Sequence, residues 1–200
     1  MAEQAPFPPM TAPKRGPRLS AFIPAAMFLI VCIFLGVGLL SDPRALPSMM
    51  IDKAMPEFEL TAIEPGADIL SNGDLKQELS LVNVFGSWCQ SCLIEHPTFM
   101  RLSRENIIPI YGIDWRDKPG AGQAWLDRFG NPYTKVGVDG ESRLAIDLGV
   151  TGAPETFVVD AQGQIRYKYT GIITEEVWRE TFIPLLAELE PSLAELEAGE

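Results

Sequence analysis

Residues 81–92 read LVNVFGSWCQSC. The first five, Leu81–Phe85, form a short apolar run with β-branched residues that breaks at Gly86, which predicts a central strand. Apolar residues at helical spacing follow Cys92, so we expect a helix to begin near Cys89. A thiol at the start of a helix meets unpaired N–H groups and the positive end of the helix dipole, which stabilise a thiolate. The stretch therefore predicts a strand that leads into a reactive cysteine pair.

The two cysteines of this stretch carry the predicted chemistry, because the third, Cys32, lies inside an apolar run and is expected to be a small apolar residue there. Cys92 lies further into the predicted helix than Cys89, so we expect Cys89 to attack and Cys92 to resolve. A zinc half-site and two buried thiols are the alternatives. Zinc needs two further ligands, however, and the chain offers only carboxylates and His96, which is expected to be a helix residue rather than a base. The pair favours redox chemistry without a metal.

Composition and charge exclude several classes of protein. The 200 residues are 46% hydrophobic and 22% charged, which suits one compact domain with appendages and excludes a collagen-like, disulfide-dense or wholly disordered chain. The net charge is −11. Because residues 1–40 hold three basic residues and one acidic residue, the acidity lies in the rest of the chain. Nucleic-acid binding depends on Lys and Arg that neutralise phosphates, so nucleic acid is not an expected partner.

An uncharged stretch near the N-terminus predicts a transmembrane anchor. Residues 21–40 read AFIPAAMFLIVCIFLGVGLL, and a helix of that length spans on the order of 30 Å, one hydrocarbon thickness. The run is longer than a signal-peptide core, and no clear small-x-small cleavage site follows it, so we expect it to stay uncleaved. Lys14, Arg15 and Arg18 precede the run, which predicts a cytoplasmic N-terminus and, in a bacterium, an inner-membrane protein whose catalytic domain is periplasmic.

The remaining sequence alternates extended and helical patterns, which indicates an α/β domain. Strands are expected over 107–113 and 135–138 and in a hairpin of 156–159 with 164–169, and helices over 123–130, 143–148 and 174–193, the last capped by Thr174. The predicted layout is a cytoplasmic tail (1–20), the transmembrane anchor (21–40), a linker (41–54), the α/β domain (55–193) and an acidic tail (194–200).

Motifs in several places resemble one family. Trp88–Cys92, WCQSC, follows the predicted strand, and Gly149–Thr156, GVTGAPET, precedes the predicted hairpin; together they resemble the thioredoxin superfamily. The likeness is more specific for the membrane-anchored DsbE/CcmG branch, the periplasmic thiol:disulfide oxidoreductases of cytochrome c biogenesis. Its further motifs are MPEFEL at Met55–Leu60, CLIEH at Cys92–His96 and GNPY at Gly130–Tyr133. The resemblance implies a thioredoxin-like fold, a central mixed β-sheet flanked by helices.

The resemblance also implies which residues surround the cysteine pair. Pro154 is then a cis-proline that faces the pair, next to backbone that binds an extended substrate chain. Glu95, one turn after Cys92, and Glu155, beside Pro154, are carboxylates that disfavour a nearby thiolate and so tune its reactivity. Trp88 is expected to pack beside the site and face the substrate. The alternatives are a trans turn proline at Pro154 and an ordinary surface position for Glu95.

The function implied by the family is reduction of disulfides by a Cys89–Cys92 dithiol that needs no other cofactor. The implied substrate is apocytochrome c or the protein that holds it, and electrons return through an integral-membrane reductase of the DsbD/CcdA kind. Two alternatives share the cysteine pair. One is a tethered thioredoxin-like reductase for copper-site assembly in a terminal oxidase, and the other is a non-catalytic scaffold whose thiols bind a metal or serve a haem pathway.

Overall fold

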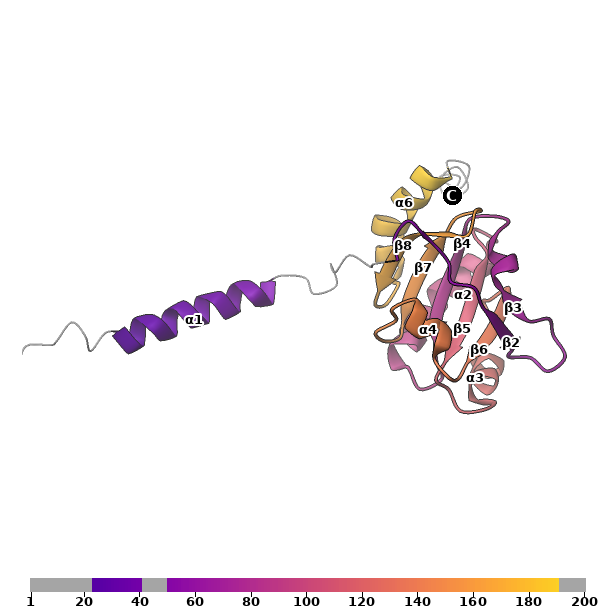
Figure 1. Ribbon diagram of the computed structural model, residues 1–200, viewed down its shortest axis with the longest axis horizontal. Coiled ribbons are helices and arrows are strands. Elements are labelled where there is room, and N and C mark those ends of the chain that lie inside the picture. The colour runs from indigo at the N-terminus through magenta and orange to yellow at the C-terminus, as the bar shows by residue number, and fades with distance from the viewer. Residues whose placement is uncertain (1–22, 41–49, 191–200) are drawn as a thin grey trace, which may run out of the picture. The chain divides into compact units, whose positions relative to one another are not determined.

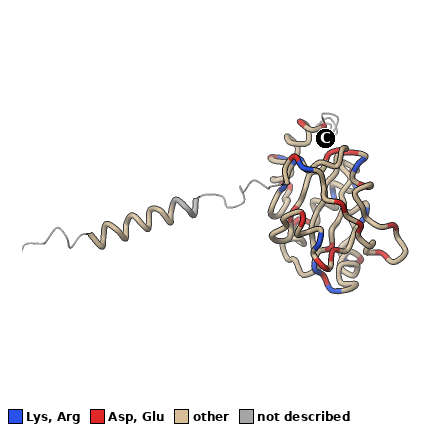
Figure 2. The backbone as a smooth tube through the Cα atoms, in the orientation of Figure 1, with Lys and Arg blue, Asp and Glu red and all other residues tan. Residues whose placement is uncertain are grey.

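The computed structural model describes residues 23–40 and 50–190, and the chain divides into two units, Met1–Ala45 and Leu46–Glu200 (Figure 1). In the first unit, helix α1 (Ile23–Leu40) covers most of the predicted anchor, and Figure 2 shows no charged residue along the part of α1 that it colours. Among the described helices, none has the length and apolar character that a membrane crossing requires. The predicted tails, 1–20 and 194–200, lie outside the described residues.

The second unit is built on a mixed sheet of eight strands, counted over the described residues, in the order β1-β8-β7-β4-β5-β6-β2-β3. Its strands are β1 (Lys53–Ala54), β2 (Glu59–Ala62), β3 (Leu70–Ser71), β4 (Ser80–Phe85), β5 (Ile110–Trp115), β6 (Lys135–Asp139), β7 (Glu155–Val159) and β8 (Gln164–Thr170). Strands β4, β5 and β6 run parallel, and the other pairings are antiparallel. The thioredoxin-like α/β fold is confirmed, with the predicted central strand at its centre as β4.

Helices cover both faces of this sheet, as Figure 1 shows: α2 (Gln90–Arg104), α3 (Ala121–Phe129), α4 (Arg143–Asp147), α5 (Glu175–Val177) and α6 (Ile183–Leu189), with a 3-10 turn at Asn72–Leu75. All six residues of β4 are buried. Leu81 and Phe85 belong to a core with residues of α2, α3 and α6. Val82 and Val84 belong to a second core with residues of α4. This alternation is the period of a strand, and it makes β4 the partition between the two cores.

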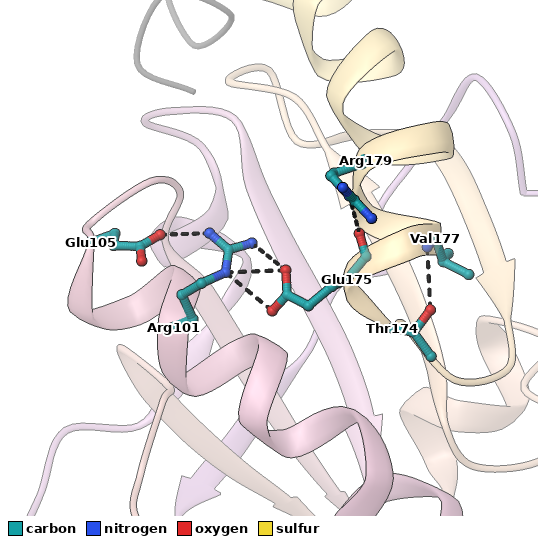
Figure 3. A network of polar contacts seen from close by, with 6 residues as sticks. All are labelled: Arg101, Glu105, Thr174, Glu175, Val177 and Arg179. Carbon is teal, nitrogen blue, oxygen red and sulfur yellow. Dashed lines mark hydrogen bonds and ion pairs between the residues drawn. The ribbon is translucent and has the colours of Figure 1, made fainter. Parts of the chain in front are cut away.

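The C-terminal helix is interrupted, which corrects the single helix predicted there. Thr174 caps it as predicted, since its Oγ1 accepts the Val177 N–H at 3.2 Å (Figure 3). A π-helical turn then separates α5 from α6, and in it the Ile183 N–H donates to Trp178 O, five residues back. Pro184 accounts for the change, because its ring nitrogen has no proton for the next helical bond and its ring crowds the preceding turn.

Two further boundaries differ from the predictions. Strand β5 was expected over 107–113, but the Ile107 N–H still bonds to Leu102 O at the end of α2, and the strand continues to Trp115, which pairs with Asp139. The folded unit also begins inside the predicted linker, because β1 pairs with β8 and forms one edge of the sheet. Both differences come from pairing between strands that are distant in sequence.

Candidate active site

The cysteine pair lies where β4 leads into α2. Cys89 is the N-cap residue of α2 and forms a disulfide with Cys92, with their Cα atoms 5.3 Å apart. The Cys92 N–H donates to Cys89 Sγ at 3.0 Å. Both residues are buried, and Cys89 is the more exposed, at 5% against 2%. The predicted start of the helix is confirmed, and the N–H aimed at Cys89 Sγ is the kind of contact that stabilises a thiolate there.

Neighbouring groups hold the turn between β4 and Cys89. Trp88 is half-exposed, its Nε1–H donates to Trp115 O at 3.1 Å, and the two indole rings meet edge to face with centroids 5.8 Å apart. A Cβ on Gly86 would lie 2.5 Å from Trp88 Nε1, so glycine at this position leaves room for the indole. Trp88 therefore packs beside the site and keeps about half of its surface exposed.

Strand pairing brings the proline loop to the same edge of the sheet. β7 runs antiparallel to β4 with Glu155 opposite Val84. The residues before Glu155 therefore lie next to the end of β4, from which the chain turns toward Cys89. The Ala153–Pro154 peptide bond is cis, the isomer that the resemblance implies, and Pro154 is buried. Ala153 packs against the core cluster that contains both cysteines, so the loop and the disulfide adjoin the same core.

Glu95 is buried, which corrects the alternative of a surface position. Its carboxylate accepts the Ile173 N–H at 3.1 Å and Asn83 Nδ2–H at 3.0 Å. Burial raises the pKa of Glu95 to about 8, although both hydrogen bonds act to lower it. Glu95 is therefore mostly neutral at pH 7. The repulsion that we expected it to exert on a Cys89 thiolate develops only as the pH rises through about 8.

Asn83 connects Glu95 to the rest of the site. Its Nδ2 also donates to Thr156 Oγ1 at 3.1 Å, and its Oδ1 accepts the Tyr133 hydroxyl at 2.8 Å. Tyr133 stacks on Phe85 with ring centroids 4.9 Å apart, and burial raises its pKa well above the usual value. We did not select Asn83 or Tyr133 from the sequence. For Asn83, a polar residue within the apolar strand β4 was the available signal. Tyr133 lies in the GNPY motif and gave no such signal.

Glu155 is also buried, but a cation compensates its charge. Its Oε1 accepts the Thr151 N–H at 2.9 Å and the Thr151 hydroxyl at 2.6 Å. Its Oε2 lies 2.8 Å from Lys168 Nζ. The sequence analysis did not select Lys168, because one polar residue in an alternating strand gives no sign of a distant carboxylate. The carboxylate next to Pro154 is thus part of an ion pair rather than a free charge.

The His96 side chain contacts the end of α3 and the residue that follows it. Its Nε2 lies 3.3 Å from Phe129 O and 3.2 Å from Gly130 O, and its ring meets Trp125 edge to face at 4.5 Å. Burial lowers the pKa of His96, against the raising effect of the two carbonyl contacts, so the neutral imidazole donates there. These contacts agree with the expectation that His96 is a helix residue rather than a base. Over residues 23–40 and 50–190, no three His, Cys, Asp or Glu side chains gather as metal ligands.

Two aspartates near the turn were missed by sequence reasoning. Asp117 accepts the Ser87 N–H at 2.6 Å and the Ser87 hydroxyl at 2.8 Å, two residues before Cys89. Asp114 is buried at the end of β5, and burial together with the charge of Asp117 raises its pKa to about 7. Asp117 and Ser87 are separated by 30 residues, so no local pattern linked Asp117 to the site.

Curated relatives share most of their length with this chain. The Redoxin family model matches residues 50–181. The thiol:disulfide interchange protein DsbE of Pseudomonas aeruginosa is 44% identical over 172 residues, which cover 86% of this chain and 95% of that protein. The DsbE of Allochromatium vinosum is 43% identical, with coverage of 84% and 92%. The thiol:disulfide interchange protein HelX of Rhodobacter capsulatus is 37% identical, with coverage of 80% and 92%.

Solved structures share the fold at lower identity. A thio-disulfide isomerase from Thermus thermophilus superimposes with a TM-score of 0.56 and 22% identity, covering 70% of this chain and 96% of that one. StoA from Bacillus subtilis gives a TM-score of 0.53 and 15% identity, covering 63% and 96%. These structures are similar to this chain in fold alone, whereas the family model and the curated relatives are similar to it in amino-acid sequence. The chain therefore belongs to the DsbE/CcmG branch of the thioredoxin superfamily and is a thiol:disulfide oxidoreductase.

Proposed function

We propose that this chain is a periplasmic reductase that removes disulfides from apocytochrome c, or from the protein that holds it, during cytochrome c maturation. The observation that carries the proposal is the Cys89–Cys92 disulfide at the start of α2, at the edge of the sheet where the cis-Pro154 loop also lies. The relatives' names support the exchange chemistry. The family resemblance supports the choice of substrate.

Reduction proceeds by two exchanges. In the reduced enzyme the Cys89 thiolate attacks one sulfur of the substrate disulfide, a mixed disulfide forms, and the other substrate sulfur leaves as a thiolate that takes up a proton. Cys92 then loses its proton and attacks Cys89 Sγ, which releases the second substrate sulfur. Two electrons have passed to the substrate, and the enzyme holds the disulfide described above. A membrane dithiol reductase of the DsbD/CcdA kind returns two electrons.

The buried groups around the pair favour the first step. The Cys92 N–H and the start of α2 stabilise negative charge on Cys89 Sγ. Glu95 carries a proton below about pH 8, so it adds little opposing charge at neutral pH. Glu155 is neutralised by Lys168. Although the domain is acidic, Glu95 and Glu155 therefore do little to disfavour the thiolate.

Residues 21–40 anchor this reductase in the inner membrane, with the N-terminus in the cytoplasm and the catalytic domain in the periplasm. The basic residues before the run and its lack of charge support this topology. The test is extraction of bacterial membranes with alkaline carbonate, followed by protease treatment of spheroplasts. We expect the full chain to resist extraction and its domain to be digested from outside. Release of the full chain by carbonate would overturn the anchor.

A trapping experiment tests the substrate. The variant Cys92→Ser, expressed with residues 1–40 intact, leaves each mixed disulfide on Cys89 unresolved, so partners can be identified by mass spectrometry of the membrane fraction. Recovery of apocytochrome c or its holder is the expected result. The double variant Cys89→Ser/Cys92→Ser is the matched control and should retain neither.

The other outcomes separate the alternatives. Recovery of copper-site proteins of a terminal oxidase would favour the copper-assembly reductase. An empty trap, together with failure of the purified protein to reduce insulin and loss of metal retention in Cys89→Ser, would favour the scaffold. Either result would contradict the proposed reduction of apocytochrome c.

A further inference from the structure

Lys168, beside the proline loop, exchanges neither electrons nor protons in the steps above. Lys168 lies on β8 opposite Phe157 of β7, and its side chain is only 10% exposed. Its Nζ lies 5.3 Å from the centre of the Phe157 ring and donates to Gly149 O at 2.7 Å. The same Nζ lies 2.8 Å from Glu155 Oε2. One cation therefore contacts both the first residue of the 149–154 loop and the carboxylate that follows the loop.

Glu155 in turn contacts the middle of the 149–154 loop. Its Oε1 accepts both the N–H and the hydroxyl of Thr151. Its Oε2 has no hydrogen-bond donor among the described residues, so the charge of Lys168 is what compensates that oxygen. A buried carboxylate that loses its cation is costly and takes up a proton or moves toward water. The placement of Thr151 thus depends on Lys168 through Glu155.

The loop held in this way lines a cleft at the end of β5. The cleft has a volume of about 560 Å³, and both Val150 and Thr151 line it together with Trp115. Trp115 is also the residue whose carbonyl and ring hold Trp88, next to Cys89. At Gly152 a Cβ would meet no atom within 4 Å, so this part of the loop faces open space. A polypeptide has room to lie along the loop there.

We propose that Lys168 is a positioning residue for the substrate. Through its ion pair with Glu155 and its hydrogen bond to Gly149, it keeps the 149–154 loop in the shape that receives an extended polypeptide near the disulfide. A polypeptide substrate must bind along the 149–154 loop, whereas a small disulfide needs only access to Cys89. The inference rests on the exchange activity and does not depend on apocytochrome c being the substrate.

The test compares two substrates with the reduced full-length chain in detergent. One is a synthetic peptide closed by a Cys-x-x-Cys disulfide, and the other is hydroxyethyl disulfide. For Lys168→Met we expect kcat/KM with the peptide to fall about tenfold, mainly through KM, because a displaced loop misplaces the bound chain. With hydroxyethyl disulfide we expect a fall of less than about threefold. Lys168→Arg keeps the charge and should recover most of the peptide activity.

Matched controls separate positioning from damage to the fold. Arg166→Met removes a cation from the same strand, where Arg166 pairs with Asp52 and Asp160, and should leave both substrates unaffected. Glu155→Gln should show the same selective loss as Lys168→Met, and it carries the test if Lys168→Met does not fold. The double variant should be no worse than either single variant, since the two side chains act as a unit.

Three results would overturn the proposal. The first is an equal loss with the peptide and with hydroxyethyl disulfide, which would mean that Lys168 acts on the fold or on the cysteines. The second is an unchanged KM for the peptide in a folded Lys168→Met variant. The third is a double variant whose loss is the product of the two single losses, which would mean that Lys168 and Glu155 act independently. Because the wild-type chain must first reduce the peptide, failure of the exchange activity itself would be visible separately.

Discussion

Two buried glutamates near the cysteine pair are stabilised in opposite ways. Glu95 on α2 meets the neutral donors Ile173 N–H and Asn83 Nδ2–H, and burial raises its pKa to about 8. Glu155 on β7 meets the ammonium of Lys168 at 2.8 Å. The two side chains are buried to nearly the same extent, 1% and 0% exposed. Burial alone therefore does not decide the charge of a carboxyl near this dithiol; the presence of a cation within contact distance does.

Removing the cation should make the second glutamate behave like the first, and this is the largest effect expected at a single pH. In Lys168→Met, Glu155 becomes a buried charge without a partner, so we expect the free energy of unfolding at pH 8 to fall by about 3 kcal/mol. Urea denaturation measures it, with Arg166→Met as the control. A loss no larger than that of the control would break the comparison.

The second prediction concerns the pH dependence that Glu95 gives to stability. Its pKa is raised from 4.5 to about 8, so the folded state holds a proton that the unfolded state has released. The resulting stability is full below pH 4.5 and is lost as the pH rises through about 8, by roughly 1.4 kcal/mol per pH unit within that window. In denaturation series, Glu95→Gln should remove about half of the slope from pH 5 to 7, where Asp114 contributes a similar amount because its pKa is raised from 3.8 to about 7, and most of the slope from pH 7 to 8. An unchanged slope would contradict the assignment.

A smaller effect is expected at Asp117, a carboxylate that is held by Ser87 rather than by a cation. Ser87→Ala removes the hydroxyl donor and leaves the N–H, so stability should fall by about 1 kcal/mol, the usual net contribution of one hydrogen bond. The fluorescence of the neighbouring Trp88 should change with it. Ser103→Ala, at an exposed position of α2, is the control and should change neither. A loss as large as that in Lys168→Met would mean that Asp117 depends on Ser87 as Glu155 depends on its cation.

The smallest effect is expected at the surface, in the network of Figure 3. Arg101 on α2 pairs with Glu175 at 2.9 Å and with Glu105, and all three side chains are partly solvated. Exposed ion pairs contribute about 0–1 kcal/mol and are screened by salt. Arg101→Met should therefore lower the unfolding free energy by less than about 1 kcal/mol, and the difference should shrink in 1 M salt. A salt-independent loss above 2 kcal/mol would show that solvation does not separate this network from the buried pair of Glu155.

Local sequence was enough to predict the elements that depend on neighbouring residues. The run Leu81–Phe85, its break at Gly86 and the helix that begins after Cys89 all follow from patterns within about a dozen residues. The cap at Thr174 was predicted on the same basis. The errors arose where a single residue or a distant strand decides: Pro184 interrupts the last helix, and pairing with β6 carries β5 to Trp115.

The site was predictable to the same extent. The sequence placed the two cysteines and the proline, because their motifs are short and contiguous. It did not predict that Glu95 is buried, because Ile173, which donates to it, lies 78 residues away. Lys168 gave no signal either, since the alternation of β8 does not say which carboxylate its side chain will meet.

By itself, then, the sequence determined the cysteine pair at a helix start, the cis-proline loop and the thioredoxin-like order of elements. The cysteine pair at the helix start rests on the patterns of adjacent residues, whereas the cis-proline and the thioredoxin-like fold were implied by motifs that resemble a known family. Only the tertiary structure decided which acids near the dithiol are neutral and which are ion-paired. The charge of a buried carboxyl depends on desolvation and on the nearest donors and cations, and the fold brings those together from distant parts of the chain.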